Sequence, residues 1–161
     1  MGDRVLPGGK KVIGGGAEVS GGGGEVLLTG MYPLNTAVYA DAHEDQWSST
    51  TMWSLKVHAI CADPLPGREY VSERSITARF DKGTTVVCPA GKSVVGSGVL
   101  VYPNGGLVSI QTLNPGSYNG SEFVAVRGAV DDPAYIDSWR IDGVRHLRQD
   151  VGRRVAAMSR P

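Results

Sequence analysis

The sequence predicts an all-β protein, an antiparallel β-sandwich or β-prism built from two tandem four-stranded repeats. Two observations predict this class. The chain contains a long internal repeat, and its apolar residues fall in short segments separated by Gly, Pro, Asn and Ser. About eight to ten antiparallel strands are expected, packed face to face.

The internal repeat relates residues 5–33 to residues 87–115 at a constant offset of 82. After a shift of four residues, Asp45 matches Asp131 and Trp53 matches Trp139, both at an offset of 86. A repeat of this length is one supersecondary unit used twice. The identical residues at the first offset are Pro7/Pro89, Gly9/Gly91, Lys10/Lys92, Val12/Val94, Gly14/Gly96, Gly16/Gly98, Val19/Val101, Gly23/Gly105, Gly24/Gly106, Val26/Val108 and Pro33/Pro115.

This repeat predicts the organisation of the chain. We expect one compact domain over residues 1–161, which is enough chain to bury a core. Within it, repeat 1 covers 4–63, a connector covers 64–83, repeat 2 covers 84–150, and a basic tail covers 151–161.

The strands of each repeat are predicted in order from their β-branched and aromatic residues. The first repeat has candidates at 11–19, 25–32, 36–43 and 52–62, and the last of these alternates, with Trp53, Leu55, Val57, Ala59 and Cys61 on one face. The second repeat has candidates at 93–102, 107–114, 122–130 and 138–147, and the Asn-Gly in "YPNGGL" predicts a tight hairpin. The connector adds a predicted strand at 75–80, and "RQDVGRRVAAM" (148–158) predicts a short C-terminal helix weakened by Gly152.

The Gly-Lys-Ser of "VVCPAGKSVVGSG" does not predict a nucleotide site. A phosphate-binding loop needs a glycine five residues before the Gly-Lys, and Val86 stands there. Pro89 also removes a backbone donor, and no helix formers follow. The motif is therefore interpreted as a turn that belongs to the repeat.

Composition excludes several classes. The chain has 16 basic and 16 acidic residues, 20% charged residues and only two phenylalanines, which is unlike a coiled coil or a disordered chain. No apolar run approaches membrane-spanning length, so no membrane partner is expected. The residues after Met1 show no apolar signal-peptide core.

The motifs of the repeat resemble a known family. "CPAGKSVVGSG", "VIGGGAEV" and "WSLKVHAICADPLPG" are similar to tandem repeats from actinobacteria and their phages, whose units read CPAGK-x-V-x-GGG … YAICADPLPG. Most members are secreted and functionally uncharacterised. The resemblance implies a β-rich extracellular module and carries no catalytic residues to transfer.

The resemblance also raises the question of a disulfide. A family unit has one Cys in CPAGK and one in AICA, whereas here each copy keeps a different one, Cys61 or Cys88. A bridge from the end of one unit to the start of the next would join Cys61 to Cys88. The alternative is two buried thiols that act as small hydrophobes.

The densest polar cluster, "DAHED", is the one candidate for a metal. Asp41, His43 and Asp45 would share one face of a strand, a spacing that suits a hard cation. An exposed acidic strand end is the favoured alternative, because the second copy keeps only Asp131. We expect no metal and no other cofactor.

No motif predicts catalysis. His58 and His146 lack a sequence-evident nucleophile and carboxylate, and no serine lies in G-x-S-x-G. The chain is therefore predicted not to be an enzyme.

Aromatic residues in loops are the candidates for a ligand surface. Trp47, Tyr118 and Tyr135 fall outside the predicted strands, where an aromatic ring could stack on a sugar. Trp53 and Trp139 occupy equivalent positions at strand starts, so both are predicted to be core residues.

The C-terminal region is the candidate for docking onto a neighbouring subunit. Between Ser138 and Pro161 the arginines outnumber the aspartates by six to two. Nucleic acid is disfavoured because the tail lacks lysine and interleaved aromatics, whereas an acidic protein surface would suit it. The candidate docking residues are Arg148, Arg153, Arg154 and Arg160.

Two classes of function follow from the sequence. The first is a structural or adhesive subunit of a larger assembly, such as a phage capsid decoration or tail protein, located in the virion. The second is a secreted cell-surface or carbohydrate-binding module that contacts glycans.

Overall fold

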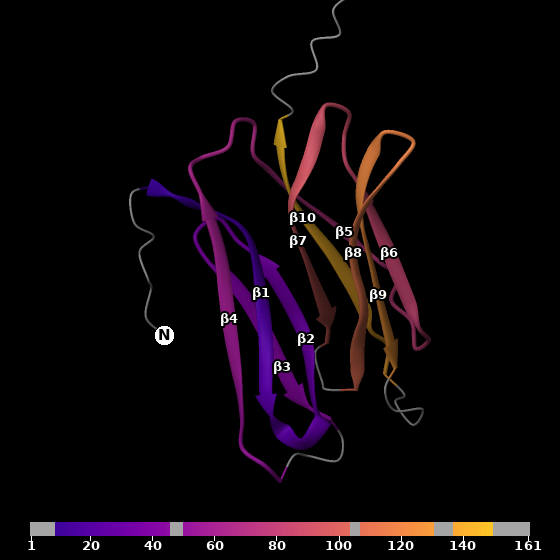
Figure 1. Ribbon diagram of the computed structural model, residues 1–161. Coiled ribbons are helices and arrows are strands. Elements are labelled where there is room, and N and C mark those ends of the chain that lie inside the picture. The colour runs from indigo at the N-terminus through magenta and orange to yellow at the C-terminus, as the bar shows by residue number, and fades with distance from the viewer. Residues whose placement is uncertain (1–8, 46–49, 104–106, 131–136, 150–161) are drawn as a thin grey trace, which may run out of the picture.

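Ten antiparallel strands form the part of the chain that the computed structural model describes, residues 9–45, 50–103, 107–130 and 137–149 (Figure 1). They are β1 (Lys11–Gly21), β2 (Val26–Pro33), β3 (Val38–Glu44), β4 (Trp53–Ala62), β5 (Glu69–Arg74), β6 (Lys82–Val87), β7 (Lys92–Tyr102), β8 (Val108–Tyr118), β9 (Ser121–Val130) and β10 (Arg140–Gln149). A single 3₁₀ turn, η2 (Gly22–Gly24), follows β1. The predicted all-β class is confirmed.

The strands make three sheets, of order β1-β4, β3-β2-β7-β10-β5 and β6-β9-β8. All pairings between them are antiparallel. Figure 1 shows β1 to β4 on one side and β6 to β10 on the other. The short β2–β7 pairing, Gly30 with Leu100 and Met31 with Val99, joins the two sides in one sheet.

The first and last strands of each half pair in the same way. Val12 pairs with Cys61 and Gly14 with Ile60 across a bulge, and Val94 pairs with Leu147 and Gly96 with His146 across a bulge. Adding 82 to the first residue and 86 to the second converts one set of pairs into the other. The same offsets relate the β2–β3 pairs to the β8–β9 pairs, including the bulge after Leu28 and after Ile110.

The hydrophobic core lies almost entirely in the second half. Seven buried residues form it, and they come from β7, β8, β9, β10 and the bridge residue before β10. Trp139 is fully buried, as predicted. The core residues are Val99, Val101, Val108, Val124, Val126, Trp139 and Ile141.

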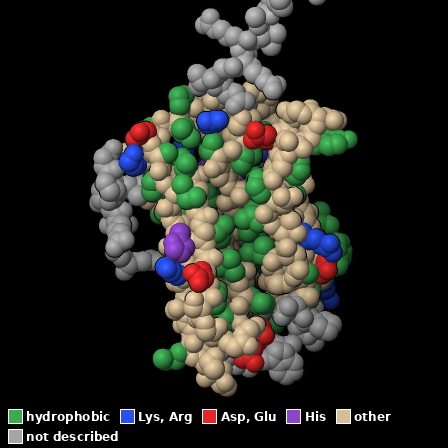
Figure 2. Space-filling view, in the orientation of Figure 1, with side chains coloured by type: hydrophobic (Ala, Val, Ile, Leu, Met, Phe, Trp, Pro, Cys, Tyr) green, Lys and Arg blue, Asp and Glu red, His purple; other side chains and the backbone are tan. Residues whose placement is uncertain are grey.

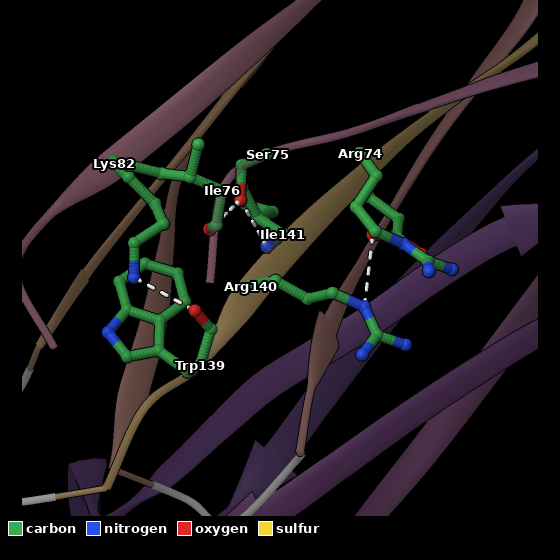
Figure 3. A network of polar contacts seen from close by, with 8 residues as sticks. Arg74, Ser75, Ile76, Lys82, Trp139, Arg140 and Ile141 are labelled. Atoms are coloured by element: carbon green, nitrogen blue, oxygen red, sulfur yellow. Dashed lines mark hydrogen bonds and ion pairs between the residues drawn. The ribbon is translucent and has the colours of Figure 1, made fainter. Parts of the chain in front are cut away.

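Lys82 closes this core over Trp139. Its Nζ lies 3.5 Å from the indole centroid and donates to the carbonyls of Ala78 (2.6 Å) and Trp139 (3.0 Å), as Figure 3 shows in part. The ammonium thus satisfies backbone acceptors while its stem covers the ring. Burial lowers the pKa of Lys82 below its ordinary value.

Trp53, the counterpart of Trp139, is not a core residue, so that prediction was wrong. It is half-buried, and its Nε1 donates to Glu44 Oε1 at 2.9 Å. The alternation predicted for β4 also fails beyond Lys56, because Val57 and Ala59 are exposed. The cause is the two-stranded sheet: β4 pairs with β1 alone among the described strands.

The connector differs from the prediction. Its strand is β5 at Glu69–Arg74, not 75–80, where only Ala78 makes an isolated bridge to Trp139. Ser75 ends the strand: its N–H donates to the Ile141 carbonyl, and its Oγ accepts from the Ile141 N–H (Figure 3). The sequence also did not predict β6, which begins at the end of the connector and lies mostly in repeat 2. The first two residues of the predicted C-terminal helix, Arg148 and Gln149, belong to β10 instead. The other residues of that predicted helix lie outside the described part of the chain.

Two glycines of β7 let the halves touch. A Cβ on Gly96 would overlap the backbone carbonyl of Ile13, and a Cβ on Gly98 would lie 2.6 Å from Tyr32 Cα. The counterpart of Gly98 in β1 is Gly16, around which a Cβ would meet no atom within 4 Å. The two equivalent glycines thus differ: Gly98 is a backbone contact site, whereas Gly16 is uncrowded among the described residues.

This contrast predicts the effects of two matched substitutions. Gly98→Ala should destabilise the fold by roughly 1–3 kcal/mol, because the backbone of β2 must move away. Gly16→Ala should change stability by less than about 1 kcal/mol. Urea unfolding of both variants measures this, and an equal loss in both would contradict the packing described.

Arg68 ties the halves together through His146. Its Nη2 donates to the Val12 carbonyl (2.5 Å) and lies 2.9 Å from Nδ1 of His146, which is 1% exposed. Because a guanidinium only donates, Nδ1 accepts and the ring is neutral. Burial and the charge of Arg68 lower the pKa of His146 below 6.5, opposed by the carbonyls of Pro33 and Val12.

This histidine predicts a pH dependence of stability. Below pH 6.5 the unfolded chain takes up a proton that folded His146 resists, so stability should fall as the pH drops from 6.5 towards the lowered pKa. His146→Gln should flatten that slope, whereas His58→Gln, at an exposed position, should leave it unchanged. Urea unfolding between pH 8 and pH 5 tests this; an unchanged slope in His146→Gln would refute it.

Candidate functional site

A groove of about 610 Å³ lies where β6 meets the far ends of β8 and β9. Three strands and a turn place its side chains: β6 forms one side, and the β8–β9 hairpin forms the other. Its lining residues are Thr85, Val87, Ser117, Tyr118, Asn119, Ser121 and Phe123.

The hairpin turn holds Tyr118 at the groove. Asn119 and Gly120 have φ of 49° and 77°, the two consecutive positive values of a two-residue hairpin turn. Asn and Gly adopt this backbone most readily, so the sequence "YNGS" dictates the tip. Tyr118 ends β8 there, with 74% of its surface exposed.

Phe123 forms the apolar floor. A Cβ on Gly116 would lie 2.7 Å from Phe123 Cζ and 3.2 Å from both Cε atoms, so the ring lies across the backbone of β8. Val87, paired with Phe123, is 55% exposed beside it. Gly116 is therefore required for the ring to reach this position.

The groove combines apolar side chains with uncharged polar groups. Its polar groups are the hydroxyls of Thr85, Ser117, Ser121 and Tyr118 and the amide of Asn119. An exposed aromatic ring with neighbouring hydroxyls and an amide suits a neutral ligand with an apolar face and hydroxyl groups.

The sequence identified one residue of this groove. Tyr118 was a predicted ligand residue, although it lies at a strand end and not in a loop. Trp47 and Tyr135, the other two candidates, lie outside the described residues. The Asn-Gly within "SYNGSEF" was the signal that could have revealed the hairpin and, with it, the position of Phe123.

The candidate metal residues do not assemble into a site. His43 Nε2 lies 3.1 Å from Asp41 Oδ2 on β3, as expected for one strand face. The N–H of Asp45, just beyond the strand, donates to the Glu25 carbonyl at 2.9 Å. Across the described part of the chain, no three His, Cys, Asp or Glu side chains gather closely enough to hold a metal ion.

The Cys61–Cys88 disulfide is absent, which corrects that alternative. The structure describes both residues and shows no bond between them. Cys61 pairs with Val12 in the two-stranded sheet, whereas Cys88 follows β6 in the three-stranded sheet and donates its N–H to the Glu122 carbonyl. The two thiols therefore belong to different sheets.

Of the four candidate docking arginines, the structure describes one. Arg148 is exposed near the end of β10 and pairs with Ser93. Arg153, Arg154 and Arg160 lie outside the described residues.

β4 is the other unusual surface. Five consecutive residues, 56–60, are exposed, with Val57 at 41% and Ile60 at 59%. On the face in Figure 2, hydrophobic side chains lie over the region where β1 and β4 run in Figure 1. An exposed apolar strand with an unpaired edge is a surface that pairs readily with another chain.

No protein-family model, curated protein or solved structure matches this chain. Among the described residues, no helix has the length and apolar character that crossing a membrane requires.

Proposed function

We propose that this chain is a non-enzymatic structural or adhesive module that acts as a subunit of a larger assembly, such as a phage capsid decoration or tail protein. One observation carries the proposal: β4 pairs with β1 alone among the described strands and exposes Val57 and Ile60. An assembly would cover such an edge. The resemblance to repeats of actinobacteria and their phages supports a virion as its setting.

We also infer that residues 4–63 and 84–150 are two copies of one unit. The shared pairing offsets of β1–β4 with β7–β10, and of β2–β3 with β8–β9, support this. The bulges in both copies support it further, because an inserted residue shifts every later pair.

The assembly proposal predicts where the native protein is found. Mass spectrometry of purified phage particles should recover the chain with an N-terminal peptide that starts at Met1 or Gly2. Culture supernatant from the same preparation is the control. Recovery only in the supernatant, with a processed N-terminus, would contradict the virion setting.

The groove at Tyr118 favours a second candidate function. A secreted cell-surface or carbohydrate-binding module would use the exposed ring to stack on a sugar and the surrounding hydroxyls to hydrogen-bond to it. The two functions are compatible, because an adhesive subunit can also bind glycans.

This second function predicts a specific loss of binding. On a glycan array, Tyr118→Ala should weaken any glycan bound by the native chain by at least about tenfold. Tyr102→Ala, at a 51% exposed tyrosine of β7 away from the groove, is the matched control and should bind as before. Equal binding by all three proteins would exclude the groove as the glycan site.

A further inference from the structure

The two repeat-equivalent strands β4 and β10 have different neighbours. β10 pairs with β7 on one edge and with β5 on the other, from Asp142–Arg74 to Leu147–Glu69. β4 pairs with β1 as β10 pairs with β7, but no described strand lies on its second edge. No described strand therefore covers the edge of β4 that corresponds to the β5 side.

Burial follows this difference. All five residues from Gly143 to Leu147 are buried, and His146 is 1% exposed. Their counterparts run from Val57 to Cys61, and four of them are exposed, with Ile60 at 59%. The first half thus lacks the cover that β5 gives to the second.

A second surface of the first half is also open. Gly96 and Gly98 of β7 receive the backbone of β1 and β2, but around Gly16, the counterpart of Gly98, a Cβ would find no atom within 4 Å. At Gly14, the counterpart of Gly96, a Cβ would lie 3.7 Å from the Ile60 side chain and 3.9 Å from the Val95 carbonyl, because Gly14 already faces β7 of its own chain. Of the two positions, only Gly16 is therefore left uncovered by the described residues.

The position of β5 in the sequence indicates which segment could pair with the exposed edge of β4. β5 belongs to the residues that follow the first repeat, and residues 150–161 follow the second. At the offset of 86, Arg154 and Arg160 stand at the positions of Arg68 and Arg74. Residues 155–160 therefore stand at the positions of β5, with Arg74/Arg160 as the identical residue within that span.

We propose that copies of this chain associate head to tail, with residues 155–160 of one copy pairing antiparallel with β4 of the next in the register that β5 makes with β10. The second half of the first copy would then pack on Gly16 of the next, as the first half packs on Gly98. The inference rests on the proposed function as an assembly subunit and names a second copy as the partner.

The sequences suit this pairing. In the β5 register, Val155 to Met158 of one copy lie opposite Cys61 to His58 of the next, which places apolar residues against the exposed Ala59 and Ile60. At the position of the Arg74–Asp142 ion pair, the register places Arg160 opposite Lys56, so this end of the pairing carries two like charges that oppose association. Backbone hydrogen bonds and apolar contacts therefore hold the association.

The register also identifies which backbone groups face the open edge. The N–H groups of Trp139 and Gln149 donate towards the connector, to Ala78 and Pro66, and the Ile141 carbonyl accepts from Ser75. Backbone groups of alternate residues along β10 therefore face β5, and Arg145 is one of these residues. Its counterpart Ala59 then directs its N–H and C=O to the edge of β4 that no described strand covers. Val144 and Ser72 then form a non-hydrogen-bonded pair, and their counterparts are His58 and Met158.

Cross-linking between two single-cysteine variants tests the register. Both carry Cys61→Ser and Cys88→Ser; one adds His58→Cys and the other Met158→Cys. The Cα atoms of a non-hydrogen-bonded pair lie about 4.5 Å apart, which a disulfide can span. Mild oxidation of the mixture should give a linked dimer in several-fold higher yield than a mixture with Gln111→Cys, an exposed residue of β8, in place of His58→Cys.

Yields equal to the Gln111→Cys control would overturn the proposal. A third variant carries both His58→Cys and Met158→Cys in one chain. A disulfide that forms only within this variant would also overturn the proposal, because the tail would then cover the β4 of its own chain. Circular dichroism confirms that each variant is folded. Because purified protein is used, the result is independent of whether the chain is recovered in virions.

A second measurement uses variants that keep both native cysteines. Light scattering after size exclusion should show that Ala59→Pro, which removes an outward N–H without breaking a bond to β1, reduces association. Ala59→Ser, which keeps the N–H, should associate like the native chain. Gly16→Gln should also reduce association while leaving the monomer folded. Unchanged association in both Ala59→Pro and Gly16→Gln would contradict the proposed interface.

Discussion

The close approach of backbone at two glycines of β7 is the constraint on which the rest of the structure depends. The carbonyl of Ile13 and the Cα of Tyr32 occupy the space that side chains at Gly96 and Gly98 would need. This contact sets β1 and β2 against β7, allows the short β2–β7 pairing, and places Arg68 where it reaches both Val12 and His146. Without it, nothing would fix the position of the first half against the second.

The strands β5 and β6 complete only one half of the molecule. β5 covers one edge of β10, and β6 contributes Val86 and Lys82 to the closure of the core above Trp139. The first half has no described strand in either position, so Trp53 remains half-buried and β4 is exposed. The same pairing pattern thus gives one half that β5 and β6 cover and one half that no described strand covers, and the proposed assembly would use the second.

The sequence predicted what depends on local pattern. Glycine and proline positions, β-branched runs and the repeat offset located the four strands of each half and the all-β class. It could not predict burial, because Trp53 and Trp139 both stand at a strand start before an alternating apolar pattern, and the strands that lie over them differ. The strand β5 was misplaced for a related reason: Ile76 and Phe80 are apolar, but both are exposed at 65% and 60%. The groove was missed except for Tyr118, because it requires β6, and the β-branched run 84–87 was not interpreted as a strand.

Hydrogen exchange of β4 as a function of protein concentration tests the central claim most directly. In dilute protein, the outward amides of Val57 and Ala59 should exchange quickly, while those of their counterparts, Gly143 and Arg145, should be protected by β5. At high concentration the β4 amides should become protected too, as a second copy covers the edge. Amides of β4 that exchange at the same rate at every concentration would contradict an edge completed by self-association.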